Sequence, residues 1–199
     1  KTLELIKKKY KDILIAKEKK RGVSAARNLG VYKSKYDWVA FLDSDDEWEG
    51  NKIEKQVDLI NNNKNQINFV HTDEIWFRNN THLNQKKKHK KKGGYIFNDC
   101  LDICKISPSS SLMKKKLLTE YGYFDESFRV CEDYELWLRI TSKEKIGYID
   151  KPLVKKYGGH SGQLSKRYWG LDRFRIKALE NLINNFPLNN NQKKKLYLK

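Results

Sequence analysis

Three aspartates crowd one short stretch of the chain: Asp43, Asp45 and Asp46. Four apolar residues, 39–42, run directly into them, and an apolar run bounded by a polar turn predicts a strand buried on both faces. In an open α/β sheet, ligands bind just beyond the carboxyl ends of such strands. Carboxylates this close repel one another, and a divalent metal that carries a phosphate offsets the repulsion, because hard oxygen ligands suit Mg²⁺ or Mn²⁺. The cluster therefore predicts a metal–phosphate site.

The aspartate cluster is open to two other interpretations. Asp favours helix caps and polar turns, so the cluster alone is compatible with a solvated capping turn. It is also compatible with a phosphatase in which Asp43 is the nucleophile and Asp45 the acid–base partner. A second acidic pair, Glu132 and Asp133, opens a predicted helix far along the chain, and there too an N-cap is the plain alternative.

The elements around the cluster predict an α/β fold. A short strand over 12–16, a helix capped by Ser24 and a strand over 38–42 make a βαβ unit, which implies parallel strands. Further strands are predicted over 67–72 and 146–149, with Pro152 keeping the segment after it at a sheet edge. Apolar periodicity and end signals predict the remaining helices: 51–61, 95–104, 114–121 before Gly122, one opening at 131–133, and 171–186. Two loops complete the pattern, a mobile basic one over 79–92 and a flexible one over 158–162.

Composition limits the class of protein. The chain has 199 residues and a formal net charge of +17, enough for one domain with a core. Its apolar runs are too short to cross a bilayer, and no signal peptide is visible. Three cysteines without framework spacing predict free thiols and a reducing, cytoplasmic location. The lysine run over 86–92 is interpreted as a solvated face, with an anionic membrane surface or an anionic lipid-linked acceptor as the alternative.

Three separated segments carry a family resemblance. Residues 21–28 (RGVSAARN), 41–46 (FLDSDD) and 132–139 (EDYELWLR) resemble, in order and spacing, glycosyltransferase family 2. The resemblance covers nearly the whole chain and implies the GT-A fold, a mostly parallel Rossmann-like sheet flanked by helices. It also implies that the first βαβ unit is largely missing and that the chain is a fragment of a longer protein. We expect a single domain over 1–199, with a nucleotide-sugar part (1–78), an acceptor and base part (79–168) and a C-terminal helix with a basic tail (169–199).

The resemblance implies a role for each residue of the donor site. Asp43, Asp45 and Asp46 are expected to form the Asp-x-Asp region that binds the ribose of the donor and, through Mn²⁺ or Mg²⁺, the diphosphate of the nucleotide sugar. Asp43 is placed with the donor-binding residues and Asp45 and Asp46 with the metal, with Asp45 as the first choice for metal contact. Arg27 and Asn28 are expected to help hold the nucleotide.

The same resemblance assigns the reaction and the rest of the site. Asp133 is the expected general base, with Glu132 beside it, and a base attacking in line inverts the anomeric centre. A helix start favours an ionised carboxylate at Asp133. His160 lies in a loop expected to close over the diphosphate. The expected function is metal-assisted sugar transfer from a nucleotide-diphosphate sugar to a glycan or lipid-linked acceptor in surface polysaccharide synthesis, on or near the cytoplasmic face of the membrane.

Two rival functions remain open. The phosphatase interpretation would put the Asp-x-Asp motif on the first strand, whereas a predicted strand and helix precede Asp43. A basic nucleic-acid-binding module would show a clustered basic stripe with interleaved aromatic residues, whereas the lysines here are scattered.

Overall fold

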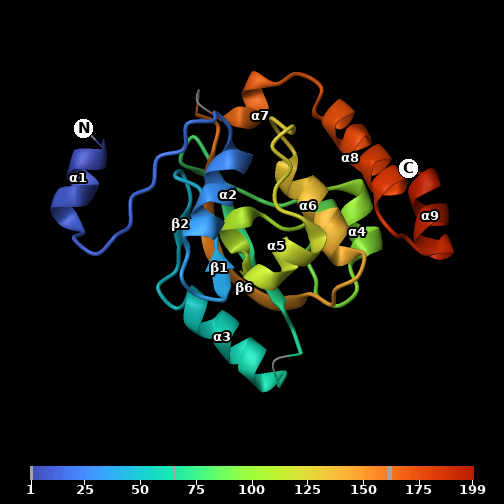
Figure 1. Ribbon diagram of the computed structural model, residues 1–199, viewed down its shortest axis with the longest axis horizontal. Helices are drawn as coiled ribbons and strands as arrows, with labels where there is room; N and C mark the ends of the chain where they lie inside the picture. The colour runs from blue at the N-terminus through green and yellow to red at the C-terminus, as the bar shows by residue number, and fades with distance from the viewer. Residues whose placement is uncertain (1, 65, 161–162) are drawn as a thin grey trace.

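The computed structural model describes residues 2–64, 66–160 and 163–199, which form one sheet with helices packed on it (Figure 1). The predicted loop residues Ser161 and Gly162 lie outside the described residues. The strands are β1 (Trp38–Ala40), β2 (Glu47–Trp48), β3 (Phe69–Arg78), β4 (Thr81–Leu83), β5 (Leu112–Lys114) and β6 (Gly147–Gly158). The helices are α1 (Thr2–Lys9), α2 (Val23–Lys33), α3 (Lys52–Asn62), α4 (Phe97–Asp102), α5 (Lys115–Tyr121), α6 (Glu132–Thr141), α7 (Leu164–Arg167), α8 (Leu171–Asn185) and α9 (Asn190–Tyr197), with 3-10 turns η1 (Lys87–His89) and η2 (Pro108–Ser110).

The sheet is mixed. Its strand order is β1-β5-β3-β6-β2, and β4 pairs with β3 outside that path. Among the described residues only β3 and β6 run parallel, and every other strand pair is antiparallel. The predicted α/β class is confirmed, but the pairing differs from the mostly parallel sheet that we expected.

The strand predicted over 12–16 is wrong, because the segment is irregular and carries no strand pairing. A strand forms only where a neighbouring strand supplies hydrogen-bond partners, and none of the described strands pairs with this segment. Ile13 and Leu14 are exposed there, and α1 stands apart from the rest of the molecule in Figure 1. Without this parallel neighbour, β1 is an edge strand of three residues, so the prediction of a strand buried on both faces through Leu42 is also wrong.

The two faces of the sheet pack against different helices. Side chains alternate between faces along a strand, so Val39, Phe69 and Met113 enter the larger core, which contains α4, α5, α6, α8 and α9. Their neighbours Val70 and Leu112 face the smaller core under α3. Figure 1 shows the larger helical layer in front of the sheet and α3 below it.

Three local predictions need correction. Helix α2 is capped by Gly22, while Ser24 lies buried inside the helix, where its hydroxyl is 3.5 Å from the carbonyl of Phe128. Pro152 was expected to keep the following segment at a sheet edge, but it falls inside the long strand β6, where the register with β3 shifts. The residues after it lie between two strands, because Val154 and Lys155 pair with β2 on one side and with β3 on the other. The segment 79–92 contains β4 and η1 rather than a loop without structure. No described helix is both long enough and apolar enough to cross a membrane.

Candidate active site

A cavity of about 960 Å³ opens beside the end of β1 and the start of α6. It brings together side chains from four separate parts of the chain. Its lining includes six of the predicted acidic and basic site residues and one predicted histidine: Arg27, Asp43, Asp45, Asp46, Glu132, Asp133 and His160. Since burial in a shared cavity places these groups within each other's fields, the cavity is the candidate active site.

Arg27, from α2, joins the two acidic motifs. Its Nη2 lies 2.7 Å from Oδ1 of Asp43, and its Nη1 lies 2.6 Å from Oε1 of Glu132. Its guanidinium also stands over the ring of Phe124. Burial alone would lower the pKa of Arg27, but the two carboxylates outweigh that effect and raise it, so the cation is permanent. The bridge fixes two motifs, separated by 89 positions in the sequence, at the wall of one cavity.

The turn that carries the aspartates is closed by a buried serine. The amide of Asp46 donates to the carbonyl of Asp43 at 3.0 Å. The hydroxyl of Ser109 donates to Oδ2 of Asp46 at 2.6 Å and accepts from the amide of Asp43 at 3.1 Å. Ser109 is fully buried in η2, and its carbonyl accepts from the indole of Trp48. One hydroxyl therefore holds both ends of the turn and sets the direction in which its carboxylates point.

Asp45 and Asp46 have different environments. Asp45 is about two-fifths exposed, and its Oδ2 lies 2.8 Å from Nε2 of His160. The Asp46 side chain is 2% exposed, and its Oδ2 lies 3.9 Å from Nζ of Lys156. Burial raises the pKa of Asp46, while the Lys156 ammonium and the Ser109 hydroxyl oppose the rise. Asp45 is thus the more exposed of the two carboxylates, with His160 as its side-chain partner at the cavity.

The residues of the cavity fit a divalent cation only in part. Within the described ranges, no group of three or more His, Cys, Asp or Glu side chains is placed to hold a metal by itself. Mg²⁺ sites in phosphate-transfer proteins commonly use one or two carboxylates and complete their shell with water and substrate phosphates. The exposed Asp45 suits such a site, whereas the oxygens of Asp46 are already engaged by Ser109, Lys156 and the amide of Tyr157.

The second acidic motif is held by an unusual helix start. Cys131, the N-cap of α6, is in the left-handed region with φ 61°, and Glu132 and Asp133 form the first turn after it. Oδ1 of Asp133 accepts from the amide of Tyr134 at 2.7 Å, and its Oδ2 lies 3.5 Å from the thiol of Cys104. Burial raises the pKa of Cys104 well above its ordinary value, so the thiol keeps its single proton, which can be donated to Asp133 or to the carbonyl of Ile106 at 3.2 Å.

Glu132 differs from its neighbour. Its side chain is nearly buried and bonded to Arg27. Burial and the adjacent Asp133 carboxylate raise the pKa of Glu132 to about 7, although Arg27 acts in the opposite direction. A group that is buried and held by an arginine suits a structural role, whereas Asp133 lines the cavity, and among the described residues its Oδ2 contacts only the weakly donating thiol of Cys104.

Asn28 does not line the cavity. Its amide nitrogen donates to the carbonyl of Phe124 at 2.9 Å and to Glu126 at 3.1 Å, and its oxygen accepts from the amide of Phe124. The structure therefore places Asn28 as a tether between α2 and the turn that precedes α6.

The site also depends on residues that no sequence pattern singles out. Ser109 lies in a run of serines after Pro108, and Lys156 is one lysine among many scattered ones. Only the pairing of β6 brings Lys156 to the aspartate turn, a contact 110 positions away in the sequence. The sequence marks Cys104 as a free thiol and nothing more. The serine run beside a proline is the single local signal that could have pointed to Ser109.

Comparison with known proteins decides the family. The family model described as glycosyl transferase family 2 matches residues 1–122. The chain belongs to glycosyltransferase family 2. This membership favours sugar transfer over the phosphatase and nucleic-acid interpretations of the acidic and basic residues.

Curated relatives are glycosyltransferases as well. An uncharacterized glycosyltransferase of Rickettsia conorii is 34% identical over 159 residues, which are 77% of this chain and 25% of that protein. The Escherichia coli protein WfgD, named as a UDP-Glc:alpha-D-GlcNAc-diphosphoundecaprenol beta-1,3-glucosyltransferase, is 30% identical over 69% of this chain and 51% of its own length. The chain thus spans between a quarter and about half of the length of these relatives.

Solved structures support the fold. The structure of Staphylococcus aureus TarS 1-349 in complex with UDP-GlcNAc matches 98% of this chain and 58% of its own, with a TM-score of 0.75 and 17% identity. TarS 1-349 in complex with UDP matches the same share of this chain with a TM-score of 0.64. The family 2 chain therefore has the GT-A glycosyltransferase fold that the resemblance implied.

Replacing Ser109 by Ala should loosen the aspartate turn and weaken nucleotide binding in the presence of Mn²⁺ by about tenfold, the contribution typical of a group that orients a ligand-holding side chain. The variant loses the hydroxyl that joins the Asp43 amide to Asp46. Calorimetric titration with a nucleoside diphosphate and Mn²⁺ measures the change. Ser110→Ala is the matched control, since Ser110 is an equally buried neighbour whose hydroxyl bonds only the carbonyl of Ser107. Equal losses in both variants would assign the effect to η2 as a whole.

Proposed function

We propose that the cavity transfers a sugar from a nucleotide-diphosphate sugar to an acceptor hydroxyl, with metal assistance and inversion at the anomeric carbon. The observation that carries the proposal is the Arg27 bridge, because it places the aspartate turn and the start of α6 on one cavity. One wall then offers groups for a diphosphate, and the other offers a carboxylate for the acceptor. Two opposed functions of this kind are what a single-displacement transfer needs.

Each residue has a stated part in the proposed reaction. Asp43 and Arg27 hold the nucleotide portion of the donor, and Asn28 acts through the turn that it tethers. Asp133, held by the Tyr134 amide and the Cys104 thiol, accepts the proton of the acceptor hydroxyl as the new bond forms.

The leaving diphosphate needs positive charge. When bound at Asp45, with Asp46 behind it, Mn²⁺ or Mg²⁺ supplies Lewis-acid stabilisation of that leaving group. His160 lies against Asp45, and Lys156 lies against Asp46. Burial would lower the pKa of Lys156, but surrounding carboxylates that include Glu74 and Asp46 outweigh burial and raise it, so its ammonium stays charged at the floor of the cavity.

The names of related proteins suggest the classes of donor and acceptor. TarS 1-349 forms a complex with UDP-GlcNAc, and WfgD is named for UDP-Glc and a lipid diphosphate acceptor. For this chain we extend these to a UDP-sugar donor and a lipid-linked glycan acceptor in surface polysaccharide synthesis, used at the cytoplasmic face of the membrane. A lipid-linked acceptor requires that the protein work at the membrane surface without needing a spanning helix of its own.

Replacing Asp45 by Asn should remove the Mn²⁺ dependence of donor binding. An amide oxygen keeps the size of the carboxylate but loses its charge, and hard divalent cations depend on that charge. We expect the dissociation constant for UDP in the presence of Mn²⁺ to rise at least about tenfold, toward the value measured with a chelator. Calorimetry over a panel of nucleoside diphosphates and nucleotide sugars gives both the constant and the preferred base.

The control is Asp37→Asn, which removes a carboxylate outside the cavity lining, just before β1. Its titration should match that of the unsubstituted chain. Metal-independent binding that is equally tight in all three proteins would remove Asp45 from the metal site. Metal-dependent release of phosphate from simple esters, without nucleotide binding, would restore the phosphatase interpretation.

A further inference from the structure

The lysine-rich segment 86–92 divides into two sets of side chains. Lys91 is buried and points inward, and Lys92 pairs with Asp99 at 2.9 Å. The others are exposed and form no ion pair with the described residues. These four are Lys86, Lys87, Lys88 and Lys90, hereafter the lysine face. Four neighbouring ammonium groups without counter-charges repel one another, and the segment must be held against that repulsion.

A buried ion pair holds one side of the segment. Nζ of Lys91 lies 2.9 Å from Oε2 of Glu74 on β3, and both side chains are about 3% exposed. The hydroxyl of Ser107 donates to the same oxygen at 2.5 Å, and the indole of Trp76 donates to the other at 2.9 Å. Burial would raise the pKa of Glu74, but Lys91 and its other partners lower it to about 2, so the pair is ionised at neutral pH. Moving Lys91 away would leave Glu74 as an uncompensated buried charge, which is costly, so Lys91 is firmly anchored.

Further contacts hold the backbone of the segment. Nε2 of His71, a fully buried side chain of β3, lies 3.0 Å from the carbonyl of Lys92. The ammonium of Lys105 donates to the carbonyls of Lys88 and Lys90. The segment that was predicted to be a mobile loop is therefore held at several points, and the backbone of the lysine face has a fixed position on the surface.

His89, within the lysine-rich segment, is surrounded by lysines and packs on an aromatic ring. Its ring packs edge-on against the indole of Trp76, with 4.8 Å between centroids. Burial lowers the pKa of His89, and so do the ammonium groups of Lys88, Lys105 and Lys86. The ring is thus neutral at pH 7, and Lys105 adds a fifth cation to the edge of the lysine face.

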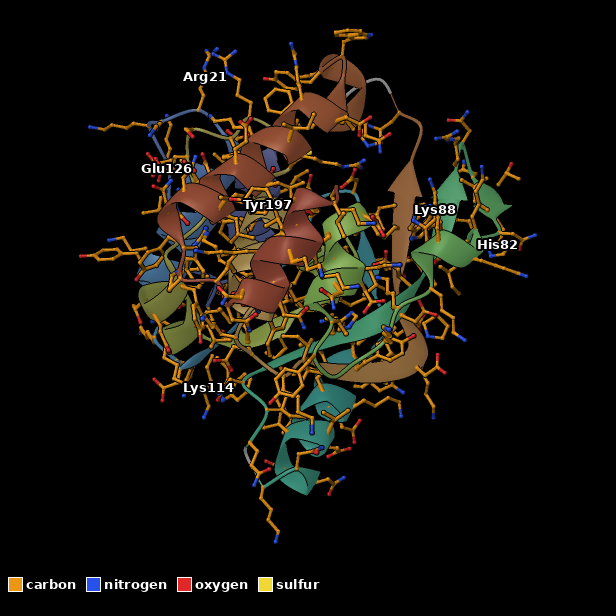
Figure 2. The ribbon with its side chains drawn as sticks, turned by 90° about the vertical axis from the view of Figure 1, so that its right-hand side faces the viewer. Arg21, His82, Lys88, Lys114, Glu126 and Tyr197 are labelled. Atoms are coloured by element: carbon orange, nitrogen blue, oxygen red, sulfur yellow. The ribbon has the colours of Figure 1, made fainter. Side chains whose placement is uncertain are left out.

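Lys105 links the lysine face to the proposed acceptor side of the cavity. Lys105 directly follows Cys104, whose thiol contacts Asp133. Figure 2 shows Lys88 and His82 together on the side formed by β4 and the outer ends of β3 and β6, while Arg21 and Glu126 lie on the opposite side. Lys105 thus connects the backbone of the lysine face to the residue that contacts Asp133.

We infer that the lysine face is a docking surface for anionic phospholipid headgroups. Exposed lysines near a membrane gain favourable energy from negatively charged lipids, and several acting together give reversible peripheral binding. The charges are all lysine, which acts as a point charge toward a diffuse anionic surface, whereas base readout relies on arginine and on free aromatic rings. The nearby rings are already engaged: Trp76 packs edge-on with His89, and Phe77 stacks on Tyr157.

The inference deepens the proposed function and rests on it for one point, the lipid-linked acceptor. Docking by the lysine face would hold the cavity next to acceptors that are anchored in the same bilayer. The binding itself depends only on the exposed lysines and can be measured without any sugar transfer.

The test compares two variants that lose the same charge. The loop variant carries Lys86→Gln, Lys87→Gln, Lys88→Gln and Lys90→Gln. The control variant carries Lys7→Gln, Lys8→Gln, Lys9→Gln and Lys11→Gln, which are exposed lysines on and after α1. Co-sedimentation is measured with phosphatidylcholine vesicles containing about one third phosphatidylglycerol, and with phosphatidylcholine alone, at about 0.1 M salt.

We expect the unsubstituted chain to bind the anionic vesicles only. The loop variant should bind them more than about tenfold more weakly, and the control variant within about twofold of the unsubstituted chain. A third variant with the four loop lysines replaced by Arg should bind like the unsubstituted chain, because it keeps the charge. All variants should show the same circular-dichroism spectrum as the unsubstituted chain, which shows that they fold, and should bind the donor nucleotide equally.

Three outcomes would overturn the inference. They are equal losses in the loop and control variants, no binding of the unsubstituted chain to anionic vesicles, and loop-dependent binding that is tighter to duplex DNA than to vesicles. The proposed function fails separately: loop-dependent vesicle binding without any nucleotide binding would leave the docking surface in place and remove the transferase assignment.

Discussion

Replacing Asp133 by Asn should reduce kcat for sugar transfer about 1,000-fold while the donor still binds with nearly unchanged affinity, because a general base contributes between about 10² and 10⁴ in rate. Asn keeps the shape of Asp133 and can still accept from the Tyr134 amide, which bonds Oδ1 at 2.7 Å. It cannot take the proton of the acceptor hydroxyl. Initial rates at saturating donor and acceptor, together with calorimetric donor binding, separate the two effects.

The matched control for this prediction is Asp58→Asn, which removes an exposed carboxylate from α3, away from the cavity lining. Its kcat and donor affinity should equal those of the unsubstituted chain. If Asp133→Asn weakens donor binding as much as it slows transfer, Asp133 belongs to the donor site. If kcat is retained, another group is the base, and Glu132 would be the next residue to replace.

The cysteine beside Asp133 refines the assignment. The Cys104 thiol keeps its proton because burial raises its pKa, and it lies 3.5 Å from Oδ2 of Asp133. A thiol is a weak donor, so it orients this carboxylate without strongly reducing its basicity. A serine there would form a stronger bond to the same oxygen and compete with the acceptor proton.

The sequence predicted the content of the site better than its contacts. Its acidic motifs lie at element ends, and such positions can be read from local patterns of apolar runs and helix starts. Asp43 and Glu132 do line one cavity, as the family resemblance implied. The Arg27 bridge, the Ser109 hydroxyl and Lys156 could not be predicted, because each depends on a contact with a distant part of the chain.

In the fold, too, local features could be predicted from the sequence and contacts between distant segments could not. The long helix α8 matches the apolar stripe predicted over 171–186, since a stripe of that length is a local property. Strand pairing is not local, and the antiparallel contacts of β5 with β1 and β3 have no signature within any single strand. The failed strand over 12–16 shows the same limit: its apolar residues favour a strand, but only a paired neighbour can form one.

Replacing Arg27 by Met should lower the free energy of unfolding by about 3 kcal/mol at pH 8, because breaking a buried ion pair from one side leaves uncompensated charge. The Arg27 side chain is 11% exposed, and that of Glu132 is 9% exposed. Met keeps much of the packing against Phe124 but leaves the carboxylates of Asp43 and Glu132 facing each other without a cation. Chemical denaturation of both proteins measures the loss.

The loss of unfolding free energy in Arg27→Met should depend on pH, and the protonation of Glu132 determines whether it grows or shrinks as pH rises. The pKa of this carboxyl is about 7 in the folded chain against an ordinary value of 4.5, so folding favours its protonated form. A group with a raised carboxyl pKa costs stability as pH rises from about 4.5 through 7, because the unfolded chain then holds fewer protons than the folded one. Without Arg27, which lowers this pKa, the pKa of Glu132 in the folded chain should rise further, and the cost to stability above neutrality should grow.

The loss of stability in Arg27→Met should therefore be smaller at pH 5 than at pH 8, whereas the exposed control Arg129→Met should show little change at either pH. A defect that stays constant across this range would mean that Arg27 stabilises the fold by packing on Phe124 rather than by joining the two acidic motifs.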